Sequence, residues 1–277
     1  MKPFLPALLA LALPAFAQGL TDEFKKNHSV WEESLGQGQG ASVRKATEAL
    51  LQQEAVTVNP SDYNAMHAME AVLNLTARAC VLEGAWEDAV DYLAKASQTA
   101  SDNANAAQGT FARLIAEHQE KLQQWRPQVA QQEQRLRLLE AQSRPSSEQL
   151  KLKAQIQQFL DEHRHSIAHS EMALKEIDSL LVLLDREKDA YAASLTEWRG
   201  FLAKERADIA SLGSVNTYAT DKLDQVMADD ARPRTERLAY ARRLLRLDPS
   251  NKGCQRFVDE LEGLGEPPAL PPRRRAK

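Results

Sequence analysis

The densest group of residues that can do chemistry lies between residues 162 and 171, where three histidines and two glutamates occur within ten positions. His165 and His169 are four residues apart, which places them one turn apart on the same face of a helix, with Glu162 one turn earlier. This spacing can hold zinc, but a zinc site also needs a third or fourth fixed ligand and supporting hydrogen bonds. We therefore interpret the group as the polar outer face of a helix, and keep a metal site at His165 and His169 as the alternative.

Signatures of catalysis are missing from the sequence. It contains no phosphate-binding loop, no Gly-rich dinucleotide turn, no Gly-x-Ser-x-Gly elbow and no His-Glu-x-x-His pattern. Neighbouring carboxylates such as Asp229 and Asp230 diverge on a helix and cannot converge on one substrate bond. The sequence predicts no catalytic residue and no cofactor, and so a protein that is not an enzyme.

The first seventeen residues have the pattern of a signal peptide. Lys2 is followed by an apolar run from Phe4 to Leu13 and then by Ala15-Phe16-Ala17, which favours cleavage before Gln18. The run is shorter than the roughly 20 apolar residues that span a bilayer, and no later stretch approaches that length. We expect residues 1–17 to be a signal peptide, the protein to be exported to the periplasm or secreted, and the rest to contain no transmembrane segment.

Charge and cysteine content narrow the class of partner. The formal net charge of −4 becomes about −5 when Lys2 is removed, and such a balance argues against nucleic acid as a partner. Cys80 and Cys254 are the only cysteines, and their separation excludes a Cys-x-x-Cys redox site. In an oxidising compartment they either form a disulfide or stay as buried thiols.

Composition and periodicity predict an all-α protein. Gly and Pro are scarce and the aromatic fraction is 6%, which is typical of long helices. Residues 18–40 hold a short amphipathic piece and a Gly-Gln repeat, and we expect a flexible segment there. Further boundaries are expected as follows: short helices in 41–107 (about 41–57, 61–83 and 86–100), long helices in 108–213 with a turn near 143–147, short helices in 214–264 (about 216–229, 233–247 and 251–264), and a disordered Pro-rich basic tail at 265–277.

The two long helices carry the pattern of a coiled coil. Apolar residues alternate at spacings of four and three in both, and Ser146 with Gln149 is a capping-box signature at the start of the second. We expect the two to fold back as an antiparallel hairpin, and the excess length of the second, with Tyr191, Leu195 and Trp198, to pack on the helices before residue 108. The seam residues are Phe111, Leu122, Trp125, Leu136, Ile156, Phe159, Ile177 and Leu184.

The region from Leu73 to Asn103 resembles the tetratricopeptide-repeat family. Small residues stand where two helices would cross, a Gly stands at the turn, and an aromatic residue follows it; the matching residues are Ala77, Cys80, Gly84, Trp86, Ala89, Leu93 and Ala96. The junctions around Asn59-Pro60 and Asp248-Pro249 resemble the turns between repeats in that family. The resemblance implies stacked helical hairpins that bind a peptide or protein partner.

These observations favour an exported, non-enzymatic scaffold or adaptor in the cell envelope. Helical-repeat surfaces and a long coiled-coil hairpin would bind protein or peptide partners, with self-association as one possibility. Two alternatives remain open at this stage: a metal- or ligand-binding envelope protein that uses His165 and His169, and a rigid spacer whose hairpin dimerises.

Overall fold

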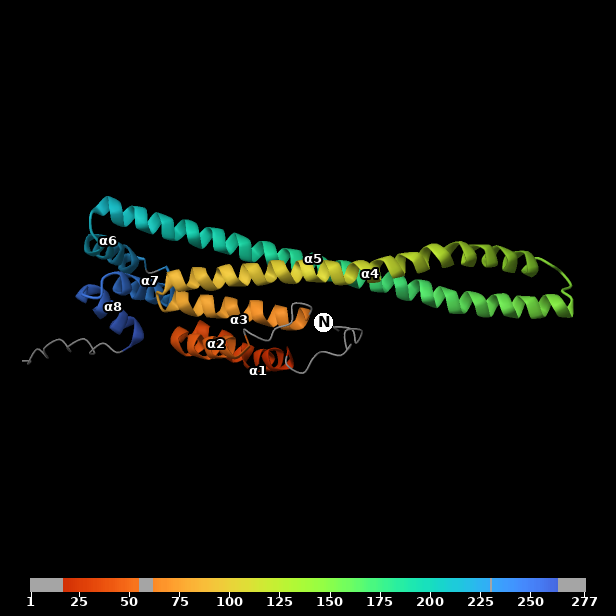
Figure 1. The fold of residues 1–277 in the computed structure, drawn as a ribbon, viewed down its shortest axis with the longest axis horizontal. Coiled ribbons are helices and arrows are strands. Elements are labelled where there is room, and N and C mark those ends of the chain that lie inside the picture. The colour runs from red at the N-terminus through yellow and green to blue at the C-terminus, as the bar shows by residue number, and fades with distance from the viewer. Residues whose placement is uncertain (1–16, 55–61, 230, 264–277) are drawn as a thin grey trace, which may run out of the picture. The chain divides into compact units, whose positions relative to one another are not determined.

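The computed structural model describes residues 17–54, 62–229 and 231–263, and in this part of the chain the regular elements are eight α-helices. The protein is all-α (Figure 1). Two compact units are present: residues 1–101 with 188–277 form the first, and residues 102–187 form the second. The expected signal peptide, apart from Ala17, and the Pro-rich tail lie outside the described residues, as does most of the junction at Pro60.

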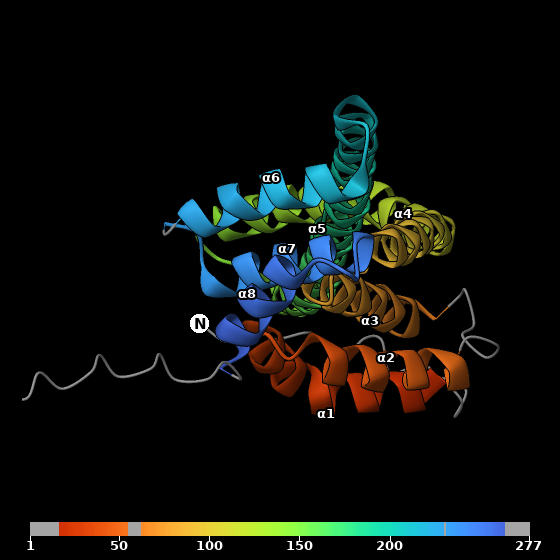
Figure 2. The same ribbon diagram turned by 90° about the vertical axis from the view of Figure 1, so that its left-hand side faces the viewer.

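Three helices build the N-terminal part of the first unit. They are α1 (Ala17–Gly36), α2 (Gly40–Glu54) and α3 (Tyr63–Leu82), and α3 packs against both others, as Figure 2 shows. Asp62 caps α3, because its carboxylate accepts a hydrogen bond from the Ala65 amide at 3.1 Å. The packed side chains include Leu20, Trp31, Leu35, Val43 and Val72.

The expectation of a flexible segment at 18–40 is wrong for its larger part. Residues 17–36 form helix α1, and Leu20, Trp31 and Leu35 are buried against α2 and α3. The Gly-Gln repeat ends this helix. The left-handed conformation at Gly38 turns the chain directly into α2, so the repeat forms a tight turn.

One helix replaces the expected break near residue 100. Helix α4 runs without interruption over Trp86–Glu140, so the boundary at 107/108 falls inside it. Residues 101–108, which the predicted ranges left between two helices, include neither Gly nor Pro, and Asn103, Ala104 and Ala107 are buried on one face of the helix. Packing of this face outweighs the weak helix propensity of Ser, Asp and Asn.

Three short helices complete the first unit. They are α6 (Val215–Ala228), α7 (Arg234–Leu247) and α8 (Lys252–Glu262), close to the ranges that the sequence predicts. Ser214 caps α6 and Asn251 caps α8, each through its side-chain oxygen, and Gly263 ends α8 with φ of 75°. These helices share one apolar core, whose residues are Tyr218, Ala219, Leu223, Val226, Leu238, Ala241, Leu244, Cys254, Phe257, Val258 and Leu261.

The second unit is an antiparallel pair formed by α4 up to Glu140 and by α5 (Ser147–Leu212) from its start (Figure 1). The predicted capping box is confirmed: the Ser146 amide donates to Gln149 Oε1 at 2.7 Å, and the Gln149 amide donates to Ser146 Oγ at 3.2 Å. Ion pairs join the two helices along their length, between Arg126 and Glu171 (2.6 Å), Glu133 and Arg164 (2.6 Å), and Glu140 and Lys153 (3.0 Å).

The late part of α5 lies in the first unit, as the excess length of the second arm predicts. Tyr191 packs against the core of α1–α3, and Leu195 and Trp198 pack against Ala89 and Leu93 of early α4. No helix among the described residues is both long enough and apolar enough to cross a membrane.

Candidate functional site

Helix α7 lies directly on the turn between α3 and α4. Gly84, with φ of 69°, forms this turn, and a Cβ atom added there would lie 2.6 Å from the Arg242 carbonyl carbon and would clash with the Arg243 amide nitrogen. Arg242 Nη1 donates to the Leu82 carbonyl and to Glu83 Oε1, both at 2.9 Å. Helices that are about 160 residues apart in sequence are therefore joined by backbone contact.

A buried ion-pair network extends from this junction. The Arg243 side chain is 5% exposed and pairs with Glu205, which is 2% exposed, at 2.6 Å, and with Glu87 at 2.5 Å. The Tyr218 hydroxyl donates to Glu205 at 3.4 Å. The hydrogen bond from Arg243 lowers the pKa of Glu87, while burial raises the pKa of Tyr218. Buried charges of this kind must stay paired, so the network holds α4, α5 and α7 in one arrangement.

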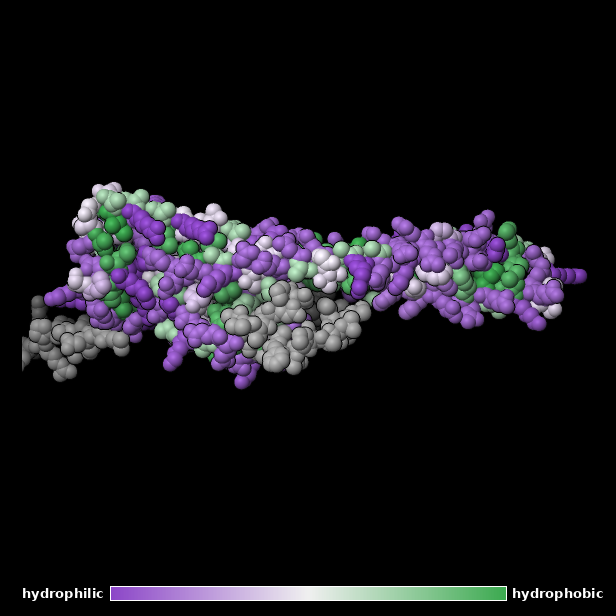
Figure 3. Space-filling view, viewed as in Figure 1, coloured by the Kyte–Doolittle hydropathy of each residue, from purple (hydrophilic) through white to green (hydrophobic). Residues whose placement is uncertain are grey.

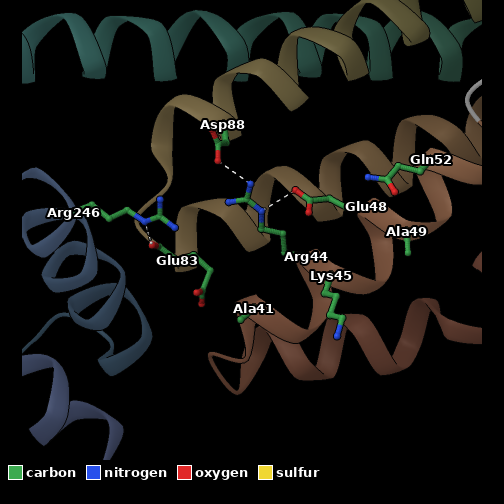
Figure 4. A pocket seen from close by; sticks show the side chains of 9 residues that line it. All are labelled: Ala41, Arg44, Lys45, Glu48, Ala49, Gln52, Glu83, Asp88 and Arg246. Atoms are coloured by element: carbon green, nitrogen blue, oxygen red, sulfur yellow. Dashed lines mark hydrogen bonds and ion pairs between the residues drawn. The ribbon is translucent and has the colours of Figure 1, made fainter.

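A charged cleft of about 570 Å³ opens beside the same turn (Figure 4). Arg44 of α2 lines the cleft, and its guanidinium pairs with Glu48 and with Asp88, both at 2.8 Å. Arg246 Nε donates to the Glu83 carbonyl at 2.9 Å, and Lys45 extends away from the Arg44 cluster. Within the described chain, neither Lys45 nor Arg246 pairs with a carboxylate, so the cleft offers two uncompensated cations to an acidic group.

Burial raises the pKa values of two groups, Tyr92 and Cys80, that interact with the Arg44 cluster. Burial raises the pKa of Tyr92 to about 12, and the hydrogen bond that its hydroxyl donates to Glu48 at 3.0 Å acts in the same direction. Burial also raises the pKa of the Cys80 thiol to about 11. Both groups are protonated near neutral pH, so neither supplies an anionic nucleophile to the cleft.

The structure places the predicted repeat-packing residues inside the first unit. Ala77, Cys80, Ala89 and Leu93 form one apolar cluster with Ala85, and Ala96 joins the core of α1–α3. Trp86 donates its indole N–H to the Val81 carbonyl at 3.2 Å and contacts three other aromatic rings, those of Trp198, Phe201 and Tyr240.

The predicted seam residues all lie in the second unit. All eight are buried or half-buried: Phe111, Leu122, Trp125, Leu136, Ile156, Phe159, Ile177 and Leu184. At the centre of the hairpin, His163 stacks on Phe159 with ring centroids 3.9 Å apart and meets Trp125 edge-on at 4.1 Å. Pro127 lies within α4, which continues through it.

The candidate zinc ligands do not form a ligand cluster. His165 and His169 are both exposed, and neither belongs to a set of three potential ligand atoms in the part of the chain that the structure describes. The His169 ring instead meets that of His118 at 6.1 Å. Burial lowers the pKa of His118, and the charges of Lys121 and His169 act in the same direction.

The two cysteines are not joined. Cys80 and Cys254 are both free and fully buried, and they belong to different apolar clusters of the first unit. Burial raises the pKa of Cys254 to about 11, as it does for Cys80. Of the two alternatives, a disulfide or two buried thiols, the structure shows two buried thiols, which pack in separate clusters.

The end of the hairpin carries exposed apolar and cationic side chains. Leu138 is 64% exposed, Leu150 54% and Leu152 47%, and Figure 3 shows hydrophobic surface close to this end of the hairpin. Four cations nearby have no carboxylate partner among the described residues. We define the tip surface as Leu138, Leu150 and Leu152 with Arg135, Arg137, Arg144 and Lys151.

Sequence reasoning missed the Arg243–Glu205 network and the Arg44 cluster. A signal was present for the first: Arg243 follows Ala239 and Tyr240 at helical spacing, so it stands on a packed face of α7. No comparable signal marks Arg44, because its partner Asp88 is 44 residues away.

Together these features define an all-α protein. Comparison with protein families, with curated protein sequences and with solved structures found no match to this chain.

Proposed function

We propose that this protein is an exported, non-enzymatic adaptor of the cell envelope, and that it binds a protein partner through the tip surface of its hairpin. The observation that carries the proposal is the combination of three exposed leucines with four unpaired cations around one turn. Large apolar side chains exposed close to one turn and bordered by cations favour an interaction site, because gathered apolar surface rimmed by polar residues is typical of such sites.

The tip surface defines the chemistry of its partner. Leu138, Leu150 and Leu152 need an apolar surface, and the surrounding cations favour carboxylates at its rim. Glu133 and Glu140 already pair with Arg164 and Lys153, and Glu148 offsets only one of the four cations, so the tip surface keeps a positive charge. We therefore expect a partner protein with an apolar patch bordered by Asp or Glu.

The first unit supports the same function. The residues that resemble a tetratricopeptide repeat pack around the α3–α4 turn, although α4 continues to Glu140, and helices of that family bind peptides. The charged cleft around Arg44 is a candidate second contact for an acidic peptide. Export is supported by the signal-peptide pattern of residues 1–17.

The test compares two triple variants of the full chain. The first replaces Leu138, Leu150 and Leu152 by Gln, and the matched control replaces Met172, Val182 and Leu183 by Gln. The control residues are 44–54% exposed against 47–64% at the tip, and they lie on the same hairpin but away from its turn. Each protein serves as bait for an envelope extract, and a protein that the wild type captures is purified and titrated directly. We expect the tip variant to lose about tenfold or more in affinity, or ~1.4 kcal/mol, and the control to retain it.

Three results would contradict the adaptor. They are equal affinity of both variants for the purified partner, binding of the tip surface to phosphatidylglycerol vesicles in place of protein, and concentration-dependent dimerisation that the tip variant abolishes. The last of these would indicate the dimerising spacer.

A further inference from the structure

A second hollow of the first unit, of about 470 Å³, is lined by aromatic rings and carboxylates. We call it the aromatic groove, and its residues used below are Trp86 of α4, Glu197, Trp198 and Phe201 of α5, and Glu236 and Tyr240 of α7. Neither the charged cleft nor the tip surface shares a residue with it.

The Trp86 ring lies at the bottom of the groove, and three other rings meet it edge-on. Trp86 is only 2% exposed, and the Arg243 guanidinium also contacts it, 5.2 Å from its ring centroid. Trp198, Phe201 and Tyr240 stand around it at centroid distances of 5.8, 5.1 and 5.0 Å and at angles of 66–86°. These three rings are half-buried, so each keeps an accessible part. Flat, rigid apolar groups such as proline rings fit between rings arranged in this way.

The rim of the groove is acidic. Glu197 and Glu236 come from different helices and are both exposed, and neither takes part in an ion pair within the described ranges. No lysine or arginine lines the groove itself; Arg232, which lies 4.9 Å from the centroid of the Tyr240 ring, pairs with Asp229 at 3.1 Å. An apolar ligand that also carries a cation is therefore the best complement.

A segment with this chemistry exists in the same chain. Residues 266–275 have the sequence Glu-Pro-Pro-Ala-Leu-Pro-Pro-Arg-Arg-Arg, and they lie outside the described residues. A polyproline II helix has three residues per turn, so a peptide of this sequence bound in that conformation presents Pro268, Pro271 and Arg274 along one edge. Aromatic-lined grooves bind such edges, and the arginine then reaches the acidic rim.

The segment begins within reach of the groove. Helix α8 ends beside α7, because Arg234 donates to the Leu261 carbonyl and Arg242 donates to Glu262 Oε1 at 2.9 Å. Arg234 and Arg242 lie on the side of α7 opposite to Glu236 and Tyr240, so the chain has to pass around the helix, a path of about 16–19 Å for a helix ~10–12 Å across. The five residues from Gly263 to Pro268 span about 17 Å when extended, which matches this path. A tether this short gives an effective concentration on the order of millimolar, so even weak contacts suffice.

We propose that the aromatic groove is a binding site for a proline-rich, arginine-bearing peptide, and that residues 266–275 of the same chain occupy it. A partner protein with a similar segment has to displace them. This inference does not depend on the tip surface, so either proposal can fail alone.

The experiment uses the full chain with p-benzoylphenylalanine in place of Leu270. After irradiation, we expect a monomeric cross-link that mass spectrometry maps to peptides containing residues 197–201 or 236–240. The Glu197→Arg, Glu236→Arg variant should lower the cross-link yield about tenfold. Adding Arg273→Glu, Arg274→Glu and Arg275→Glu to that variant should restore it, because the charges are then exchanged.

A matched control carries the same change of charge elsewhere, as Glu176→Arg with Asp178→Arg on the exposed face of the hairpin, and should leave the yield unchanged. Far-UV circular dichroism confirms that each variant is folded. The proposal is overturned by cross-links that spread over other surfaces, by a yield that ignores the charge exchange, or by cross-links found mainly between two chains.

Discussion

Replacement of Gly84 by alanine tests the contact between α7 and the α3–α4 turn. Two costs add at this position. The first is the left-handed backbone, which costs a residue other than Gly roughly 1–2 kcal/mol. The second is steric, because the new methyl group would overlap the Arg243 amide and lie 2.6 Å from the Arg242 carbonyl carbon. These are backbone atoms and cannot rotate away, so we expect the methyl group to push α7 off the turn, at roughly 1–3 kcal/mol.

Gly213 provides the matched control. Its φ of 77° is close to the 69° of Gly84, but no atom lies within 4 Å of an added Cβ. The Gly213→Ala variant therefore carries the backbone cost alone. The gain from a less flexible unfolded chain is the same in both variants and cancels in their difference.

The measurement is urea-induced unfolding of both variants and the wild type. Tryptophan fluorescence suits it, because Trp31, Trp86 and Trp198 lie in the first unit. We expect Gly84→Ala to lower the free energy of unfolding by about 1–3 kcal/mol more than Gly213→Ala. Losses that agree within about 0.5 kcal/mol would show that α7 moves off the turn freely, and would refute the close packing described above.

Three further outcomes follow from the buried groups. Arg243→Met should lower the free energy of unfolding by about 3 kcal/mol, because it leaves the Glu205 carboxylate buried without its cation, and Glu205→Met in the same chain should recover most of the loss in urea titrations. Burial lowers the pKa of His118, so the unfolded chain takes up a proton at about pH 6.5 before the folded one does. The stability that this histidine contributes is thus present above pH 6.5 and lost as pH falls through its folded-state pKa. A His118→Gln variant should therefore show a smaller drop in melting temperature between pH 7.5 and 5.5 than the wild type. An unchanged drop would contradict this assignment. The native protein should react slowly with a thiol reagent at pH 8 and yield two thiols per chain after denaturation without reductant, because Cys80 and Cys254 are buried and free, whereas a disulfide would yield none.

Periodicity predicted the local structure well. The four-three alternation identified both arms of the hairpin, and Ser146 with Gln149 located the start of α5 to within a residue. These features depend on residues that are near each other in the sequence, so a pattern can display them.

Contacts between segments that are far apart in the sequence could not be predicted from periodicity. Gly84 was placed at a turn by its spacing, but nothing near it shows that the backbone of Arg243 would cover it. The predicted break between residues 100 and 108 is wrong, because the burial of Asn103 and its neighbours in α4 depends on packing that the sequence does not display. Periodicity shows which face of a helix is covered, and it does not show what covers it.

The ion pairs along the hairpin have a consequence beyond their strength. Exposed pairs of this kind contribute little to stability. Sliding α5 by one heptad in one direction would bring Arg164 opposite Arg126, and sliding it in the other would bring Glu171 opposite Glu133. The first displacement replaces attraction by repulsion, whereas in the second the repulsion between the two glutamates is offset because Arg126 meets Asp178. The charges therefore disfavour a slide in one direction, and so help to fix which residues are presented at the turn.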